Sequence, residues 1–193
     1  MRCVNCMKEF DEKYGLCPHC GYIIGTPAKE PFQLPPGTIL SGRYLVGTAV
    51  GVGGFGITYR GWDNTLQQMI AIKEYYPSAN GIVNRNPGEA KVIVYSGVRE
   101  AEFEKGKERF LSEARNMAKF SSHPNIVHVY DYFQENGIVG ELEDLIEERI
   151  GKRIHVRMMD ESQEVNQQEL VLHDVKDAAQ KRIRMPIEMV PDS

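Results

Sequence analysis

The chain contains the stretch Gly51-Val52-Gly53-Gly54-Phe55-Gly56, which continues as Ile57-Thr58-Tyr59-Arg60-Gly61-Trp62 and later reaches Ile70-Ala71-Ile72-Lys73. Residues 44–50, 57–62 and 69–75 are rich in β-forming side chains, with the glycines in the first gap and a turn at Asp63-Asn64 in the second. A glycine turn between two strands lets backbone N–H groups approach a polyphosphate without obstruction by side chains. The stretch therefore predicts a phosphate-binding glycine hairpin, with Lys73 on the following strand as a positive charge for the same phosphates.

Two other kinds of glycine-rich nucleotide loop do not fit this stretch. The dinucleotide-binding pattern requires its glycines to open a helix, whereas residues 57–62 are typical of a strand. A Walker A loop requires Lys and then Ser or Thr after its last glycine, and here Ile57 follows Gly56. The pattern favours a glycine hairpin between two antiparallel strands.

Four motifs make this chain similar to a known family. They are Leu34-Pro35-Pro36-Gly37-Thr38, Gly42-Arg43-Tyr44, Gly53-Gly54-Phe55-Gly56-Ile57-Thr58-Tyr59 and Ala71-Ile72-Lys73-Glu74-Tyr75. With them the chain resembles bacterial serine/threonine protein kinases that carry an amino-terminal zinc ribbon, from its first residue to about Gly137. The resemblance implies an α+β fold, in which a zinc ribbon precedes a kinase amino-terminal lobe with an antiparallel sheet and one αC-type helix.

The resemblance also implies a nucleotide site for ATP with Mg²⁺. In the family the glycine loop covers the phosphates, Val50 and Ala71 would contact the adenine, and Lys73 would pair with the α- and β-phosphates. Thr58 stands where the family has valine, and its methyl group can still pack on the base. The residues assigned to the site in this way are Val50, Gly51, Gly53, Gly54, Phe55, Gly56, Thr58, Ala71 and Lys73.

A helix is predicted downstream, because apolar and polar residues recur there at helical spacing: Arg109, Phe110, Glu113, Met117 and Phe120. In the family a glutamate on this helix pairs with the strand lysine and positions it for the phosphates. The motif Phe110-Leu111-Ser112-Glu113-Ala114 places Glu113 best in that role, with Glu102, Glu104 and Glu108 as rivals. A solvated helix face is the alternative. Residues 77–96 predict an inserted loop or hairpin before this helix, and residues 127–133 predict a fourth strand after it.

All four cysteines lie within the first 20 residues, as Cys3-x-x-Cys6 and Cys17-x-x-Cys20. Two such knuckles supply the four tetrahedral sulfur ligands that a structural Zn²⁺ prefers, and they leave no open position for catalysis. A segment of this size cannot bury enough apolar surface to fold alone, so metal binding would supply its folding energy. Two disulfides are the alternative, and they are disfavoured in a chain without an export signal.

Composition limits the classes of partner. The 193 residues carry a formal net charge of −4 and are 41% hydrophobic, which gives no case for nucleic-acid or membrane binding but allows a packed core. No apolar run approaches the roughly 20 residues that span a bilayer, so we expect a cytoplasmic protein with ATP and a protein as partners. The predicted domains are a zinc ribbon at 1–25, a proline-rich linker at 26–40, a kinase-like lobe at 41–137 and an unassigned α+β tail at 138–193.

The tail contains no recognisable hinge, catalytic loop or metal-binding D-F-G motif. Leu172-His173-Asp174-Val175-Lys176 lacks the arginine of the kinase catalytic loop and is interpreted as a chance resemblance. Within the tail, residues 140–150 predict an acidic helix, 152–159 and 181–189 predict strands, and 163–168 predict a loop.

The sequence therefore favours a truncated kinase-like protein that holds a nucleotide loop but has no independent phosphotransferase activity. Two alternatives remain open. One is a fragment of an active ATP-dependent serine/threonine kinase. The other is a zinc-ribbon interaction module with a vestigial nucleotide site.

Overall fold

The computed structural model describes residues 1–78, 81–119, 127–143, 154–157, 169–174 and 183–186. The chain divides into two units, Met1–Leu145 and Ile146–Ser193. Within the described ranges, none of the helices combines the length and the apolar character that a membrane span requires.

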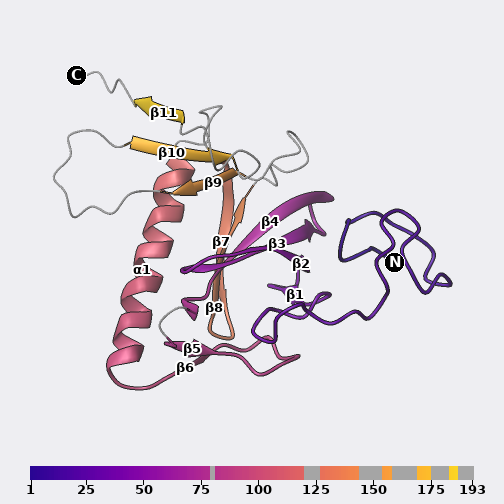
Figure 1. Cartoon of the computed structure of the whole chain (residues 1–193), viewed down its shortest axis with the longest axis horizontal. Helices are drawn as coiled ribbons and strands as arrows, with labels where there is room; N and C mark the ends of the chain where they lie inside the picture. The colour runs from indigo at the N-terminus through magenta and orange to yellow at the C-terminus, as the bar shows by residue number, and fades with distance from the viewer. Residues whose placement is uncertain (79–80, 120–126, 144–153, 158–168, 175–182, 187–193) are drawn as a thin grey trace. The chain divides into compact units, whose positions relative to one another are not determined.

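The first unit is built on one antiparallel sheet with the strand order β1-β2-β3-β4-β8-β7 (Figure 1). Its strands are β1 (Ile39–Leu40), β2 (Tyr44–Val52), β3 (Gly56–Asp63), β4 (Gln68–Tyr75), β7 (Val129–Glu135) and β8 (Ile138–Glu143). A single long helix, α1 (Val98–Lys119), contacts β7 and β8. The strands predicted at 44–50, 57–62, 69–75 and 127–133 and the predicted helix are thus confirmed, while Phe120 lies outside the described residues.

Helix α1 packs its apolar stripe on the end of β4. The buried residues of the helix are Phe103, Phe110, Leu111, Ala114 and Met117. The ring of Tyr75 meets those of Phe103 and Phe110 at centroid distances of 5.3 and 5.7 Å. Gly106 leaves room for this contact, because a Cβ there would overlap the Tyr75 hydroxyl group. The packing fixes the helix beside the strand that carries Lys73.

Strand β8 corrects the prediction of a helix over residues 140–150. Gly140 to Glu143 are strand, and they pair with β4 and β7, while residues 144–150 lie outside the described part of the chain. The turn between β7 and β8 is Asn136-Gly137, with φ of 51° and 77°, the combination that a two-residue hairpin turn requires. The acidic composition concealed a strand that the Asn-Gly signal could have located. The sheet therefore continues past the predicted lobe boundary at residue 137.

The predicted insertion at 77–96 forms a hairpin that is anchored in the core. Strands β5 (Val83–Asn84) and β6 (Ile93–Val94) pair antiparallel. Beside them, the fully buried Arg85 guanidinium pairs with the fully buried Glu74 carboxylate on β4. The hydroxyl of Tyr59 donates to Glu74 at 2.8 Å and accepts from the Leu34 N–H at 3.0 Å. Core, insertion and proline-rich linker are joined by this polar cluster.

The second unit contains a three-stranded antiparallel sheet of β9 (Ile154–Arg157), β10 (Glu169–Asp174) and β11 (Ile183–Pro186), in the order β11-β10-β9. The strands predicted at 152–159 and 181–189 are confirmed over residues 154–157 and 183–186. The rest of these two ranges and the loop predicted at 163–168 lie outside the described residues. His173 and Asp174 lie on β10, paired with His155 and Ile154 of β9. This regular strand pairing fits the interpretation of residues 172–176 as a chance resemblance.

Candidate functional site

The four cysteines lie together at the amino terminus. Their sulfurs are all within 4.8 Å of one another, and the Sγ atoms are 3.7 Å apart both for Cys3 and Cys20 and for Cys6 and Cys17. A tetrahedral ion about 2.3 Å from each sulfur sets neighbouring sulfurs about 3.8 Å apart, whereas a disulfide needs about 2.05 Å. The cysteines are free thiols. The spacing therefore fits a tetrahedral metal ion.

The two knuckles have the same backbone geometry. The N–H of Met7 donates to the Cys3 carbonyl and the N–H of Gly21 donates to the Cys17 carbonyl, both at 2.8 Å. Met7 and Gly21 have φ of 58° and 73°, in the left-handed region that turns the chain back on itself. Each knuckle thus turns its two thiols toward one point, which the sequence predicted from the spacing alone.

The cysteine cluster is connected to the sheet through its first knuckle. The Asn5 side chain donates to the Cys20 sulfur at 3.5 Å and accepts from the Thr48 hydroxyl at 2.9 Å. The Thr48 N–H donates to the Val4 carbonyl at 2.9 Å, and the Arg60 guanidinium donates to the Asn5 carbonyl. Residues of β2 and β3 therefore hold the ribbon, a contact that the sequence did not reveal.

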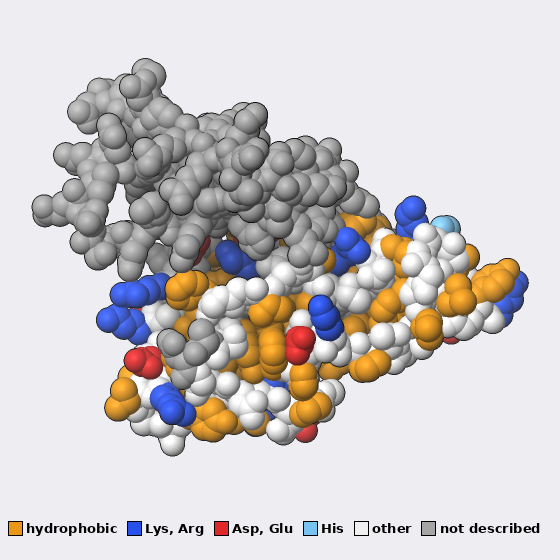
Figure 2. All heavy atoms as spheres, in the orientation of Figure 1, with side chains coloured by type: hydrophobic (Ala, Val, Ile, Leu, Met, Phe, Trp, Pro, Cys, Tyr) orange, Lys and Arg blue, Asp and Glu red, His pale blue; other side chains and the backbone are white. Residues whose placement is uncertain are grey.

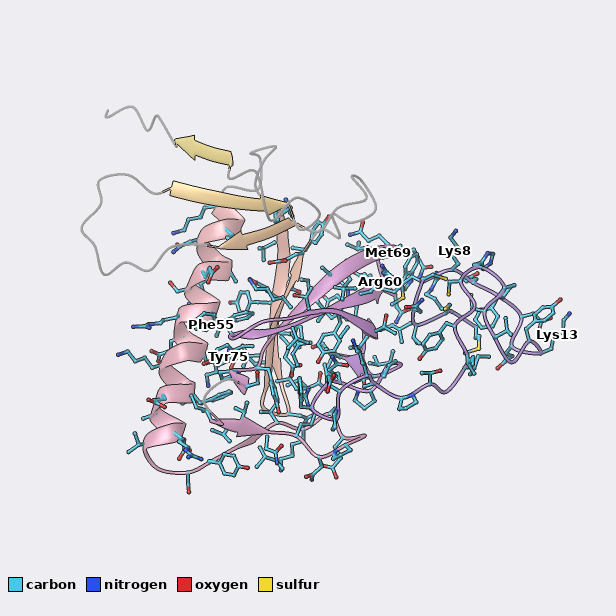
Figure 3. The ribbon with its side chains drawn as sticks, in the orientation of Figure 1. Lys8, Lys13, Phe55, Arg60, Met69 and Tyr75 are labelled. Carbon is cyan, nitrogen blue, oxygen red and sulfur yellow. The ribbon has the colours of Figure 1, made fainter. Side chains whose placement is uncertain are left out.

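The glycine hairpin between β2 and β3 is open at its tip. The Gly53 N–H donates to the Gly56 carbonyl at 2.8 Å, which closes the turn. The Phe55 side chain is 76% exposed, and Figure 3 shows it at the same end of the sheet as Tyr75. A Cβ on Gly54 would meet open space. Gly54 therefore leaves the tip open, as a loop that covers phosphates requires.

Other predicted nucleotide contacts lie close to this tip. A Cβ on Gly56 would overlap the Glu74 carbonyl oxygen, so only glycine lets β3 pair closely with β4 at that point. Gly51 pairs with Thr58 across β2 and β3, and Val50 precedes it on β2. The structure thus brings the predicted glycines, Val50 and Thr58 to one end of the β2–β3 hairpin.

One face of the sheet carries the remaining predicted residues. Thr58 is opposite Lys73 in the β3–β4 register. On the other side of β4, Lys73 is opposite Glu141 and Ala71 is opposite Glu143 of β8. Directly opposed residues of antiparallel strands share a face. Two acidic residues therefore lie on the same face as the predicted adenine and phosphate contacts.

Lys73 forms its ion pairs with β8. Its Nζ lies 2.6 Å from Glu141 Oε1 and 3.7 Å from Glu143 Oε1, and it lies 5.5 Å from the centre of the Phe110 ring. Burial by itself lowers the pKa of the Lys73 ammonium, but attraction to Glu143 and Glu141 outweighs it and raises the pKa; Glu113 contributes least. These are the ion pairs of Lys73 among the described residues. The Lys73–Glu113 pair implied by the family stays a prediction.

Glu141 and Glu143 are the residues that the sequence reasoning missed. The Glu141 side chain is 1% exposed, and its Oε2 has no hydrogen-bond partner among the described residues. Burial raises the pKa of Glu141 to about 8, against the attraction of Lys73 and with the support of Glu143. The Glu-x-Glu spacing in the segment that follows the Asn-Gly turn is the signal that could have identified them, because alternate residues of a strand share a face.

The fold defines a class of protein. A solved structure described as the apo form of PpkA-294 matches with a TM-score of 0.54 and 31% identity, over 62% of this chain and 43% of that chain. The curled antiparallel sheet with one long helix is the amino-terminal lobe of a protein kinase fold. No protein-family model matches the chain.

Curated relatives agree on the family. The chain is 30% identical to the serine/threonine-protein kinase PknG of Mycobacterium leprae over 130 residues and 31% identical to PknG of Mycolicibacterium smegmatis over 121 residues. It is 31% identical over 105 residues to the DNA damage-responsive serine/threonine-protein kinase RqkA of Deinococcus radiodurans. The matches cover 67%, 62% and 53% of this chain, and 13%, 12% and 12% of those kinases. Over about 60% of its length the chain is therefore homologous to bacterial serine/threonine kinases.

Proposed function

We propose that the first unit binds ATP with Mg²⁺ as a kinase amino-terminal lobe and that this chain alone does not transfer phosphate. The observation that carries the proposal is the open glycine hairpin beside Lys73. Gly53 and Gly54 leave its tip unobstructed, while Gly56 lets β3 approach the strand that bears Lys73. Homology to serine/threonine kinases supports the same ligand.

Phosphoryl transfer requires a catalytic base and a metal-binding carboxylate together. The one similar motif among the described residues, at His173 and Asp174, belongs to a regular strand. The first lobe supplies a lysine and backbone donors, which bind phosphate but leave the base and the metal ligands to other residues. Weak binding without turnover is the result we expect of this chain.

Titration of the purified chain with Mg²⁺-ATP by isothermal calorimetry tests the proposal. We expect Lys73→Met to weaken binding roughly tenfold or more, because a hydrogen bond to a charged group contributes about 1.5–3 kcal/mol. Lys91→Met, on an exposed residue of the insertion, is the matched control and leaves affinity unchanged. Equal affinity of the wild type and Lys73→Met would contradict the site. Phosphorylation of a general protein substrate that Lys73→Met abolishes would instead favour the alternative of an active kinase fragment.

We propose Zn²⁺ as the ion of the cysteine cluster. Four free thiols at tetrahedral spacing support it, since soft thiolate ligands select zinc over harder cations. A four-thiolate site also favours the cytoplasm as the compartment, because cysteines stay reduced there. Elemental analysis should find one zinc per chain.

A second candidate function is a protein contact through the ribbon. Leu16 and Ile23 face each other across an isolated bridge, and they are 50% and 64% exposed; Tyr14 beside them is 49% exposed. Figure 2 shows hydrophobic side chains on the surface at this end of the first unit. A protein that co-purifies with the wild type but not with a zinc-loaded Leu16→Glu/Ile23→Glu variant would support this contact. Unchanged co-purification would contradict it.

A further inference from the structure

The position of the Lys73 ammonium identifies its partner in this chain. Lys73 extends from β4 and meets Glu141 directly across the β4–β8 ladder, with 2.6 Å between Nζ and Oε1. Glu143, two residues along β8, lies 3.7 Å away. Both acids belong to the strand next to β4, whereas Glu113 lies on helix α1. One lysine therefore faces two carboxyl groups that strand pairing holds in place.

We propose that Glu141 and Glu143 of β8, rather than Glu113 of α1, position the Lys73 ammonium, and that nucleotide phosphates must compete with these two acids for it. The first half concerns the protein without ligand and stands by itself. The second half rests on the proposed function, because it needs phosphates to reach Lys73.

Glu141 is buried beside Lys73 and can therefore hold its ammonium group in a fixed position. Its side chain is 1% exposed, and its Oε2 lacks a partner among the described residues, so its contact with Lys73 is its main polar interaction. Gly140 permits this arrangement, because a Cβ there would approach the Phe133 ring to 2.7 Å and the Lys73 carbonyl oxygen to 2.9 Å. The close approach of the β8 and β4 backbones brings Glu141 to Lys73.

The charges on this face oppose an anionic ligand. With both acids ionised, two negative charges surround one positive charge, and a polyphosphate adds further negative charge to the same face. The charged and titratable groups near Glu141 are Lys73 on β4, Glu143 on β8 and, on β7, Tyr132, which is the register partner of Glu141. From α1, Glu113 acts on Lys73 at longer range, and the Arg115 guanidinium lies 5.5 Å from the centre of the Tyr132 ring. Burial and Glu143 raise the pKa of Glu141, so a proton on Glu141 neutralises one acid near neutral pH. Phosphate binding should therefore weaken as that proton leaves in alkaline solution.

Acylation of Lys73 tests the first half without any nucleotide. The side chain is 30% exposed, so an amine-specific reagent can reach it, and peptide mass spectrometry follows its rate of labelling at pH 9. Loss of a partner that raises the pKa of Lys73 by one unit increases the neutral amine, and hence the rate, about tenfold. We expect Glu141→Gln to accelerate labelling on this order, Glu143→Gln to accelerate it less, and Glu113→Gln to change it little.

One control variant and one fallback comparison complete this experiment. Glu100→Gln makes the same chemical change on an exposed position in the first turn of α1 and should match the wild type. Glu143→Gln, on a less buried acid, provides the comparison if Glu141→Gln does not fold. A larger acceleration in Glu113→Gln than in both β8 variants would overturn the assignment of the lysine's partner.

Binding of Mg²⁺-ATP and of inorganic tripolyphosphate at pH 6.5 and pH 9 tests the competition. We expect wild-type affinity to fall several-fold from pH 6.5 to pH 9, and the affinity of Glu141→Gln to stay constant and exceed that of the wild type at pH 9. The affinity for adenosine, which carries no phosphate, should change neither with pH nor with Glu141→Gln. Weaker phosphate binding by Glu141→Gln at both pH values would overturn the competition. If no variant binds ATP at either pH, the proposed function fails while the labelling still decides which residue holds Lys73.

Discussion

Arg85→Met is the substitution with the largest expected effect on stability. Arg85 and Glu74 are both fully buried, and the guanidinium also donates to the Phe32 carbonyl at 2.7 Å and to the Ala90 carbonyl at 3.2 Å. Methionine fills much of the same volume but provides no donor. The change therefore leaves a buried carboxylate and two backbone carbonyls without their cationic partner.

The magnitude follows from these contacts. Removing one partner of a buried ion pair costs about 3–5 kcal/mol, and each lost hydrogen bond to a carbonyl adds about 0.5–1.5 kcal/mol. We expect Arg85→Met to lower the free energy of unfolding by roughly 4–8 kcal/mol. A whole domain has only about 5–15 kcal/mol of stability, so the variant should be close to unfolding at room temperature.

Urea denaturation followed by the fluorescence of Trp62, the only tryptophan, measures this effect. Trp62 lies on β3 with the Arg2 guanidinium 3.6 Å from its ring centre, so it reports on the sheet and on the ribbon contact. Arg99→Met is the matched control, because Arg99 is exposed and makes two weak contacts among the described residues, at 3.3 Å with the Gly81 carbonyl and at 5.6 Å with the centre of the Tyr95 ring. A loss below about 1 kcal/mol in Arg85→Met, or equal losses in both variants, would refute the reasoning.

The pH dependence of stability provides a second test of the Arg85→Met prediction. Burial raises the pKa of Glu74 above the ordinary value of 4.5, and Arg85 opposes this rise. Without Arg85 the folded-state pKa rises further, so the folded variant keeps a proton that the unfolded chain loses above pH 4.5. Stability of Arg85→Met should therefore be closest to that of the wild type below pH 4.5 and should fall behind as the pH rises. In Glu74→Leu/Arg85→Met neither charge of this pair remains, and most of the lost stability should return.

Three other outcomes are expected. Cys17→Ser, at a fully buried ligand position, should reduce bound zinc from one per chain to a small fraction by elemental analysis, and full retention would contradict a four-thiolate site. Gly47→Ala should lower the free energy of unfolding by about 1–3 kcal/mol in urea denaturation, because a Cβ there would overlap the Val4 carbonyl oxygen. Gly15→Ala is the control and should cost less, because a Cβ at that position meets open space. Equal losses of stability in the two variants would contradict the contact between the ribbon and the sheet. The pKa of Glu141 is raised to about 8, so the free energy of unfolding of the wild type should fall as the pH rises from 4.5 to 8. Glu141→Gln should remove that part of the pH dependence of stability. The same pH dependence in the variant and the wild type would contradict a raised pKa of Glu141.

Local sequence signals were sufficient for the elements that depend on near neighbours. The cysteine spacing located both knuckles, and runs of β-forming side chains separated by glycine and turn signals located β2, β3 and β4. The helical spacing around Phe110 and Glu113 located α1. In these segments each residue's preference agrees with the element it joins, so composition and period identify the element.

Other features could not be read in this way, because they depend on which distant segments meet. The strand at Ile138–Glu143 was hidden by acidic residues that suggested a helix, and pairing with β4 and β7 overrode that tendency. The contact of Thr48 with Asn5 joins β2 to the ribbon, and the Arg85–Glu74 pair joins the insertion to β4.

The sequence by itself determined that this chain has a cluster of four cysteines able to hold a metal ion and a glycine hairpin followed by a strand lysine, because both are set by spacing within short segments. The tertiary structure decided which acid meets that lysine. The family resemblance predicted Glu113 of the helix as the partner of Lys73, but Glu141 is separated from Lys73 by one step across a strand ladder that only folding forms. Burial then raises the pKa of Glu141, a consequence of packing that no pattern of residues expresses.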